Sequence, residues 1–330
     1  MNRRQYLART GAAGVSTGLI ASLAGCLDGL PGSSEGSDVE VSDRTGQRAL
    51  DRAAGRLNKA AQSLNDLEGL ENPEEVEFDP TEPRAHLDAA REHLETAETE
   101  LGDDRAADVE TLRSYADALD GLLSVTVTVT DETIADDIDA VNAALEEEGD
   151  LEKANGIVDA RYTKISDASH RHTQVDATIT EIDDERLADL AGIELADLED
   201  GAATLGDVVT SLETLAGAYD MTIDDDEGYG ALEHGQSHVD DGEYEAAQDE
   251  FETAETTFAT SLSQLEDGRA EAPEGLADYF ETAICQNRHL TEAAAAFADG
   301  AAAAADGDPA ARTYQSKGET ELEAVRNCTD

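Results

Sequence analysis

The sequence predicts an all-α protein of about nine mostly antiparallel helices, packed as a bundle or as helical hairpins. Hydrophobic residues make up 39% of the 330 residues. Along most of the chain they recur every three or four positions, which places them on one face of a helix. Three of the six prolines fall within residues 72–83, and no two segments alternate convincingly enough to form a sheet.

Helices are expected in the first half wherever this apolar face is continuous. Residues 45–70 space their alanines and leucines by three and four from Ala49 to Leu67, and residues 84–101 do so from Leu87 to Leu101. Between them the sequence NPEEVEFDPTEP predicts a loop, because proline interrupts helices. A third pattern covers residues 104–122 and 134–145 and stops at Gly149 and Asp150.

Residues 124–130 give conflicting local indications. They read SVTVTVT, and alternating β-branched residues favour a strand. The other strand candidate is 175–182, where Val175, Ile179 and Ile182 also fit helical spacing. We favour a buried helix over residues 124–130, with a strand as the open alternative.

Further helices are expected at about 151–180, 194–219, 228–241, 243–266, 273–300 and 308–328, each closed by Gly, Asp or Pro. The body is predicted to divide near residue 183 into an N-terminal half, 46–182, and a C-terminal half, 183–330. Residues 84–101 and 241–258 share seven of eighteen residues. An ancestral duplication and chance both account for this similarity.

Cys285 and Cys328 are predicted to form a disulfide across the last helical hairpin. In an antiparallel hairpin, residues equidistant from the turn lie at the same height. The midpoint of this pair falls between Asp306 and Gly307, where composition already suggests a turn. An exported protein with two such thiols favours oxidation, and two free buried thiols are the alternative.

The first 25 residues are predicted to be a cleaved export signal. Residues 1–9 carry three arginines and no acid, and residues 10–27 carry no charge, so a basic start precedes an apolar segment that is short for a spanning helix. The sequence NRRQYL, with Arg3 and Arg4, resembles a twin-arginine signal, and LAGC resembles a lipobox ending at Cys26. The resemblance implies lipid attachment at Cys26 and a location on the outer face of the cytoplasmic membrane.

Residues 26–45 are predicted to be a flexible acidic tether, because they are rich in Gly, Ser and acid. The chain after residue 25 holds 19 Lys and Arg against 77 Asp and Glu, a net charge of about −58. Only Lys59, Lys153, Lys164 and Lys317 are lysines, and tryptophan is absent. Joined to the export signal, this composition resembles the exported lipoproteins of halophilic archaea and implies a fold that depends on salt to screen its self-repulsion.

A helical hairpin within residues 231–254 carries small and aromatic residues at positions that matter for close packing. These are Gly235, Gly242, Tyr244, Ala247, Phe251 and Ala254. Their spacing resembles the tetratricopeptide repeat, although Ala231, His234 and His238 stand where that repeat has Trp, Leu and Tyr. The resemblance implies a helical hairpin and favours a protein-binding surface.

Several histidines have neighbours at spacings that could suit a metal ion. His234 and His238 lie four apart on one helix face and are the candidate metal ligands, with ordinary helix packing as the alternative. His170 and His172 face different sides of a helix. His289 and Glu292 faintly resemble the H-x-x-E of imelysin-like iron-associated lipoproteins, but Asn287 stands where that family has Gly.

No catalytic residues and no cofactor are predicted. The sequence contains no G-x-S-x-G, no nucleotide-binding loop, no intact calcium loop and no Glu-x-x-His. Clusters of Lys and Arg for nucleic-acid binding are also missing. The sequence therefore favours a non-enzymatic, lipid-anchored binding or scaffold protein with an envelope protein as partner. Capture of a ligand or metal for transport is the alternative, and the sequence leaves the oligomeric state open.

Overall fold

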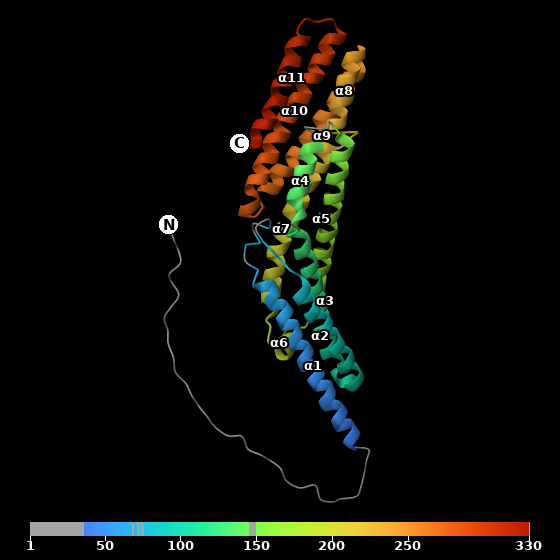
Figure 1. The fold of residues 1–330 in the computed structure, drawn as a ribbon, viewed down its shortest axis with the longest axis vertical. Helices are drawn as coiled ribbons and strands as arrows, with labels where there is room; N and C mark the ends of the chain where they lie inside the picture. The colour runs from blue at the N-terminus through green and yellow to red at the C-terminus, as the bar shows by residue number, and fades with distance from the viewer. Residues whose placement is uncertain (1–35, 68, 71–72, 74–75, 145–149, 330) are drawn as a thin grey trace, which may run out of the picture. The chain divides into compact units, whose positions relative to one another are not determined.

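The chain is helical throughout its described part, as a computed structural model shows (Figure 1). The model describes residues 36–67, 69–70, 73, 76–144 and 150–329. Its elements are α1 (Gly36–Asn65), α2 (Thr81–Glu100), η2 (Asp103–Arg105), α3 (Ala106–Val129), α4 (Thr133–Ala143), α5 (Leu151–Thr180), α6 (Asp184–Ala191), α7 (Leu195–Ile223), α8 (Tyr229–Asp241), α9 (Tyr244–Arg269), η4 (Glu274–Leu276), α10 (Ala277–Ala305), α11 (Ala311–Val325) and η5 (Arg326–Thr329). These residues contain no strand, and the predicted all-α class is confirmed.

The described residues from Val41 onward form one compact unit. The largest group of buried side chains, here the N-terminal core, comes from α1, α2, α3, α5, α6 and the first half of α7. It is built of Ala, Leu, Val and Ile around Tyr115, whose side chain is fully buried. This core includes residues on both sides of position 183, and the division into halves stays a prediction.

Helix α7 continues from the N-terminal core to a second group of buried residues. There Leu215 and Ala218 of α7 pack with Leu265 of α9 and Phe280 of α10. A buried polar cluster accompanies this contact. Thr222 donates to the side-chain oxygen of Asn287 over 2.8 Å, and the Ser261 hydroxyl donates to the Ala218 carbonyl over 3.1 Å. Because unpaired buried polar atoms are costly, these bonds fix the three helices in one register.

The C-terminal core belongs to α8, α9 and α10, with α11 packed along α10 (Figure 1). It contains Phe251, Phe258 and Phe297, which are surrounded mainly by alanine. Phe251 and Phe297 face each other with ring centroids 5.3 Å apart. Large rings and small neighbours together let these helices lie close without leaving voids.

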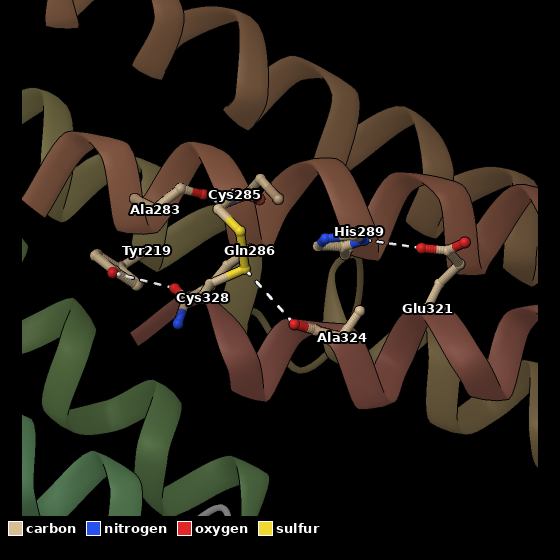
Figure 2. Close-up of a disulfide and its surroundings, with 9 residues drawn as sticks. Tyr219, Ala283, Cys285, Gln286, His289, Glu321, Ala324 and Cys328 are labelled. Atoms are coloured by element: carbon tan, nitrogen blue, oxygen red, sulfur yellow. Dashed lines mark hydrogen bonds and ion pairs between the residues drawn. A yellow bond between two sulfur atoms is a disulfide. The ribbon is translucent and has the colours of Figure 1, made fainter. Parts of the chain in front are cut away.

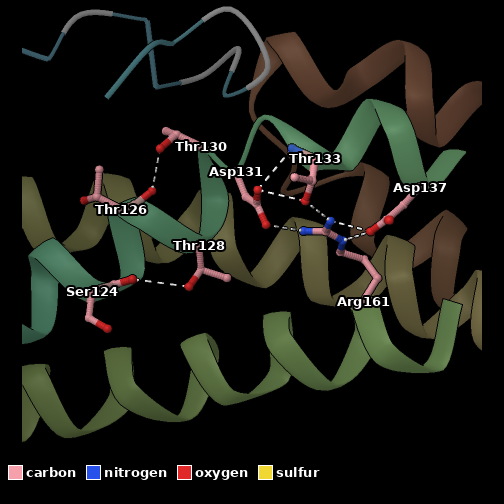
Figure 3. Close-up of polar contacts among 8 residues, drawn as sticks. All are labelled: Ser124, Thr126, Thr128, Thr130, Asp131, Thr133, Asp137 and Arg161. Atoms are coloured by element: carbon pink, nitrogen blue, oxygen red, sulfur yellow. Dashed lines mark hydrogen bonds and ion pairs between the residues drawn. The ribbon is translucent and has the colours of Figure 1, made fainter. Parts of the chain in front are cut away.

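The SVTVTVT segment is helical, so the favoured prediction over residues 124–130 is confirmed through Val129, where α3 ends. Figure 3 shows how the buried threonines fit a helix. The Thr126 hydroxyl donates to the Leu122 carbonyl over 2.9 Å, and the Thr130 hydroxyl donates to the Thr126 carbonyl over 2.8 Å. Each hydroxyl is thereby satisfied within its own helix, which removes the main cost of burying it.

The structure corrects several predicted boundaries. Helix α1 begins at Gly36, so residues 36–45 of the predicted tether are helical; residues 26–35 lie outside the described part. Helix α2 begins at Thr81 and includes Pro83 in its first turn. Proline is tolerated there, because the backbone N–H groups of the first turn have no hydrogen-bond acceptor within the helix. Short α6 was not predicted, since Leu187 is its only buried residue. An Asp183 cap and Gly192 at φ 68° close its ends.

Candidate functional site

The repeat-like hairpin is formed by α8 and α9. Gly235 of α8 faces the ring of Phe251 so closely that a Cβ added at Gly235 would lie 2.5 Å from the ring. Ala247 and Ala254 are fully buried, Gly242 ends α8 at φ 77°, and Tyr244 is half-buried at the start of α9. Gly235, Ala247 and Ala254 thus pack inside the hairpin and Gly242 lies at its turn, while the tetratricopeptide resemblance stays a prediction.

An open groove of about 1010 Å³ lies between α9 and α10. Its floor is made of alanines, among them the half-buried Ala295 and the buried Ala298. Its walls carry hydroxyl and amide groups such as Thr256 and Gln264. The groove is therefore bounded by small side chains, which leave room for the side chains of a bound segment.

The groove is acidic on both walls. Glu252 and Glu255 of α9 and Asp299 of α10 line it, and no Lys, Arg or His contributes to its lining. The amide of Gln248 donates to the Glu252 carboxylate over 2.7 Å and holds it in place. Three carboxylates around an alanine floor favour a ligand that combines positive charge with small or apolar contacts.

A second cavity, of about 1060 Å³, lies beside α3 and α5. It is lined by both signs of charge, including Lys164, Arg171, Asp131 and Asp167, and by exposed His170. Sequence inspection missed this site because its residues come from three separate segments. No sequence motif marks their convergence.

Arg161 organises the wall of this second cavity (Figure 3). Arg161 is only 8% exposed. Its guanidinium donates to Asp131 over 2.9 Å and to the Thr133 hydroxyl over 2.8 Å, and it pairs with Asp137. Burial raises the pKa of Asp131, but hydrogen bonds from Thr133 and Arg161 outweigh this effect, so the pKa lies below its ordinary value. The cluster attaches the start of α4 to α5.

Among the described residues, no group of potential ligands converges on His234 or His238, the predicted metal ligands. His234 is exposed, whereas the Nδ1 of His238 donates to Glu243 over 2.9 Å at the start of α9. His172 is buried and donates from Nε2 to the Ala202 carbonyl over 2.7 Å. Both bonded histidines thus have structural partners.

The predicted cysteine pairing is confirmed, because Cys285 and Cys328 lie at disulfide distance with Cα atoms 5.7 Å apart. The bridge joins α10 to η5, next to the end of α11 (Figure 2). One helical turn beyond Cys285, His289 donates from Nδ1 to the Glu321 carboxylate of α11 over 2.8 Å. Sequence inspection had paired His289 with Glu292, which is exposed; Glu321 was missed because only the folded hairpin brings it near.

Residues Arg3, Arg4 and Cys26, which carry the predicted export signal and lipid attachment, lie outside the described residues. Among the described helices, none combines the length and hydropathy needed to cross a membrane.

Comparisons with protein-family models, curated proteins and solved structures give no match for this chain.

Proposed function

We propose that this protein is a lipid-anchored extracytoplasmic scaffold that binds a cationic segment of an envelope protein, without catalysis. The acidic groove between α9 and α10 is the observation that carries the proposal. It involves α9, the second helix of the repeat-like hairpin, but of its lining only Gln248 and Glu252 fall within residues 231–254, for which the resemblance favours a protein-binding surface. The anchor at Cys26 would hold this surface near the membrane.

Charge complementarity identifies the class of partner. Glu252, Glu255 and Asp299 offer three carboxylates with no basic residue among the groove lining. A second copy of this chain is disfavoured, because each copy carries a net charge of about −58 after residue 25. A segment that presents Lys or Arg beside small apolar residues fits both the walls and the alanine floor.

Strong salt does not remove this type of contact. The screening length falls to about 3 Å in molar salt, which suppresses long-range attraction but has less effect on charges in direct contact. Recognition would therefore depend on fit and direct ion pairs, and much less on electrostatic steering. A partner selected in this way would tolerate brine.

Covalent cross-linking on intact cells tests the proposal. A tagged protein is cross-linked in the cells' own medium, purified, and analysed by mass spectrometry. We expect one reproducible envelope partner joined through residues 248–264 or 295–302. Replacing Glu252, Glu255 and Asp299 together by Lys should abolish the cross-link.

The matched control reverses three exposed carboxylates of α7 that lie outside the groove, at Glu199, Asp200 and Asp207. This variant has the same net charge as the groove variant and should retain the partner. Equal loss of cross-linking in both variants would show that only total charge matters. A partner held through other helices, or no partner at all, would contradict the groove assignment.

Anchoring is tested separately through Cys26. Replacing Cys26 by Ser removes the thiol that takes the lipid, so the protein should leave the membrane fraction and lose incorporation of labelled lipid. A variant that stays membrane-bound would contradict anchoring at this residue. Metal content of protein purified without chelator tests the alternative of metal capture.

A further inference from the structure

The two cysteines of the last hairpin have a third potential metal ligand beside them. The ligand atoms of Cys285, His289 and Cys328 all lie within 4.8 Å of one another. In a tetrahedral zinc site with bonds of about 2.0–2.3 Å, neighbouring ligand atoms are about 3.3–3.8 Å apart. The three groups therefore need only small side-chain movements to reach one ion, once the sulfur–sulfur bond is opened.

The fold places these groups together from two elements. Cys285 and His289 lie four residues apart on one face of α10, and Cys328 reaches the same height from η5 (Figure 2). All three are half-buried, so the position is sheltered yet open to a small ion. Two thiolates and an imidazole form one of the ligand sets that zinc uses when it keeps an open coordination position.

Glu321 orients the histidine for this role. A carboxylate can only accept, so the Nδ1 of His289 carries the proton in its 2.8 Å hydrogen bond to Glu321. The unprotonated Nε2 then lies on the opposite side of the ring, toward the two sulfur atoms (Figure 2). Carboxylate–histidine pairs of this kind fix the imidazole of metal-ligating histidines.

A disulfide that served only as a staple would need no such histidine. A comparable pair, His238 and Glu243, has the same Nδ1–carboxylate contact at 2.9 Å, but in the part of the chain that the structure describes it belongs to no group of converging ligand atoms. The feature that distinguishes His289 is therefore its position between a carboxylate and two sulfur atoms.

We propose that the reduced hairpin binds one thiophilic divalent cation, such as Zn²⁺, through Cys285 Sγ, Cys328 Sγ and His289 Nε2. A dithiol or phosphine reductant supplies two electrons, and with two protons these convert the disulfide into two thiols. Zn²⁺ then displaces the two thiol protons, and its two positive charges balance the two thiolates. Water occupies the fourth position. The oxidised hairpin has neutral sulfur atoms and does not bind the ion, so the site is redox-gated.

Cobalt binding tests the site, because Co²⁺ replaces Zn²⁺ and reports thiolate ligation in its absorption spectrum. The full chain in molar salt is reduced with a phosphine and titrated with Co²⁺, then with Zn²⁺. We expect a thiolate-to-cobalt charge-transfer band, tetrahedral d–d bands, one ion per chain, and loss of both signals when Zn²⁺ is added. The oxidised protein should show neither band.

Variants distinguish the residues that bind the metal from Glu321, which only orients His289. Cys285→Ser with Cys328→Ser should lose the charge-transfer band, and His289→Ala should alter the d–d bands and weaken binding at least tenfold. Glu321→Gln, which affects only the orientation of His289, should weaken binding about 10- to 100-fold. His238→Ala is the control and should leave the titration unchanged.

Several outcomes would overturn the proposal. Reduced wild-type protein that binds Co²⁺ no better than the double serine variant would show that surface carboxylates account for all binding. A His238→Ala effect equal to that of His289→Ala would place the imidazole ligand elsewhere. If reduction unfolds α11, metal must restore its helical circular dichroism, and failure to do so would equally refute the site.

Discussion

The N-terminal and C-terminal cores are both formed between packed helices, but they are filled by different kinds of side chain. The N-terminal core is aliphatic and contains one buried aromatic residue, Tyr115, while the C-terminal core is built on Phe251, Phe258 and Phe297. In the N-terminal region an ion pair between Arg186 and Asp108, whose side chain is 14% exposed, joins α6 to α3. The C-terminal region has a disulfide. Many small contacts hold the first region, whereas a few large ones hold the second.

This contrast has a geometric reason. Six helices contribute to the N-terminal core, so each leucine meets neighbours from several directions. The buried residues of the C-terminal core come from three helices, with α11 packed against them, and its rings rest on glycines of neighbouring helices, Phe251 on Gly235 and Phe297 on Gly318. A ring that rests on a glycine has no neighbouring side chain that could fill the space left by its removal, so truncating the ring leaves a large cavity. Single substitutions should therefore cost more in the C-terminal region.

The largest difference is expected from truncating a core side chain in each region. Phe251→Ala should lower the free energy of unfolding by about 3–5 kcal/mol, and Leu119→Ala by about 2–5 kcal/mol, since both side chains are fully buried and leave a cavity. Chemical denaturation in molar salt measures both. A smaller loss at Phe251 than at Leu119 would contradict the view that few large contacts hold the C-terminal region.

Removing the disulfide should have the next largest effect. Joining two cysteines that are 43 positions apart in the sequence contributes about 4 kcal/mol on the chain-entropy model, less any strain. Cys285→Ser with Cys328→Ser should therefore speed amide hydrogen exchange in α10 and α11. Amides of α3 serve as the internal control and should exchange unchanged. Equal acceleration in both regions would mean that the whole chain unfolds as one cooperative unit.

Glycine-to-alanine changes compare how the two regions tolerate an added methyl group. At Gly235 the methyl would meet three atoms of the Phe251 ring within 2.9 Å, whereas at Gly121 it would approach chiefly one methyl of Val175. Overpacking costs about 1–3 kcal/mol, and alanine regains about 1 kcal/mol of helix propensity. We expect a net loss of about 1–2 kcal/mol at Gly235. Gly121→Ala should be destabilising as well, because the added methyl would lie 2.2 Å from the Cγ2 of buried Val175, a β-branched side chain with little rotamer freedom in a helix. Thermal denaturation compares the two variants.

Ion pairs give a smaller, pH-dependent difference. Burial raises the pKa of Asp108, but hydrogen bonds and charge from Arg186 and Arg105 outweigh it and hold the pKa below its ordinary value. Because the pKa of Asp108 is lower in the folded than in the unfolded protein, ionised Asp108 stabilises the fold at pH values above the unfolded pKa of about 4. This stabilisation is lost as the pH falls through the folded pKa. Asp108→Asn should cost about 1 kcal/mol at pH 7.

The pH series supplies the check on Asp108. The stability gap between wild type and Asp108→Asn should close as pH falls below about 4, because protonated Asp108 no longer pairs with either arginine. Glu281→Gln is the control from the C-terminal region, where the carboxylate is 66% exposed and its pair with Arg269 contributes little. A gap that persists in acid would show that Asp108 acts through packing.

Tyr115→Phe should give the smallest effect, and in the opposite direction. The Tyr115 hydroxyl is buried and has no hydrogen-bond partner among the described residues, and burial raises the pKa of the phenol. Removing an unsatisfied polar atom without changing shape should stabilise the protein by up to about 1 kcal/mol. Thermal denaturation in molar salt measures this gain. A loss of stability would reveal a partner for the hydroxyl.

Local sequence rules located most of the helices because their periodicity and end signals are short-range. The apolar steps that begin at Ala49 and Leu87 predicted α1 and α2, and the position of Gly307 predicted the turn that aligns Cys285 with Cys328. The same rules gave no warning of α6, which has one buried residue and depends on its neighbours. Periodicity identifies which face of a helix is apolar, but it does not show which other helix that face contacts.

By itself, the sequence determined the all-α class, the repeat-like spacing in α8 and α9, and the cysteine pairing, because each depends on residues at fixed separations along one helix or across one turn. Only the tertiary structure decided that Glu321 approaches His289, that Arg161 meets Asp131 and Asp137, and that acids of α9 and α10 face one groove. These contacts join residues from different helices. Their formation depends on the rotation and height of each helix, which the packing of the whole core sets.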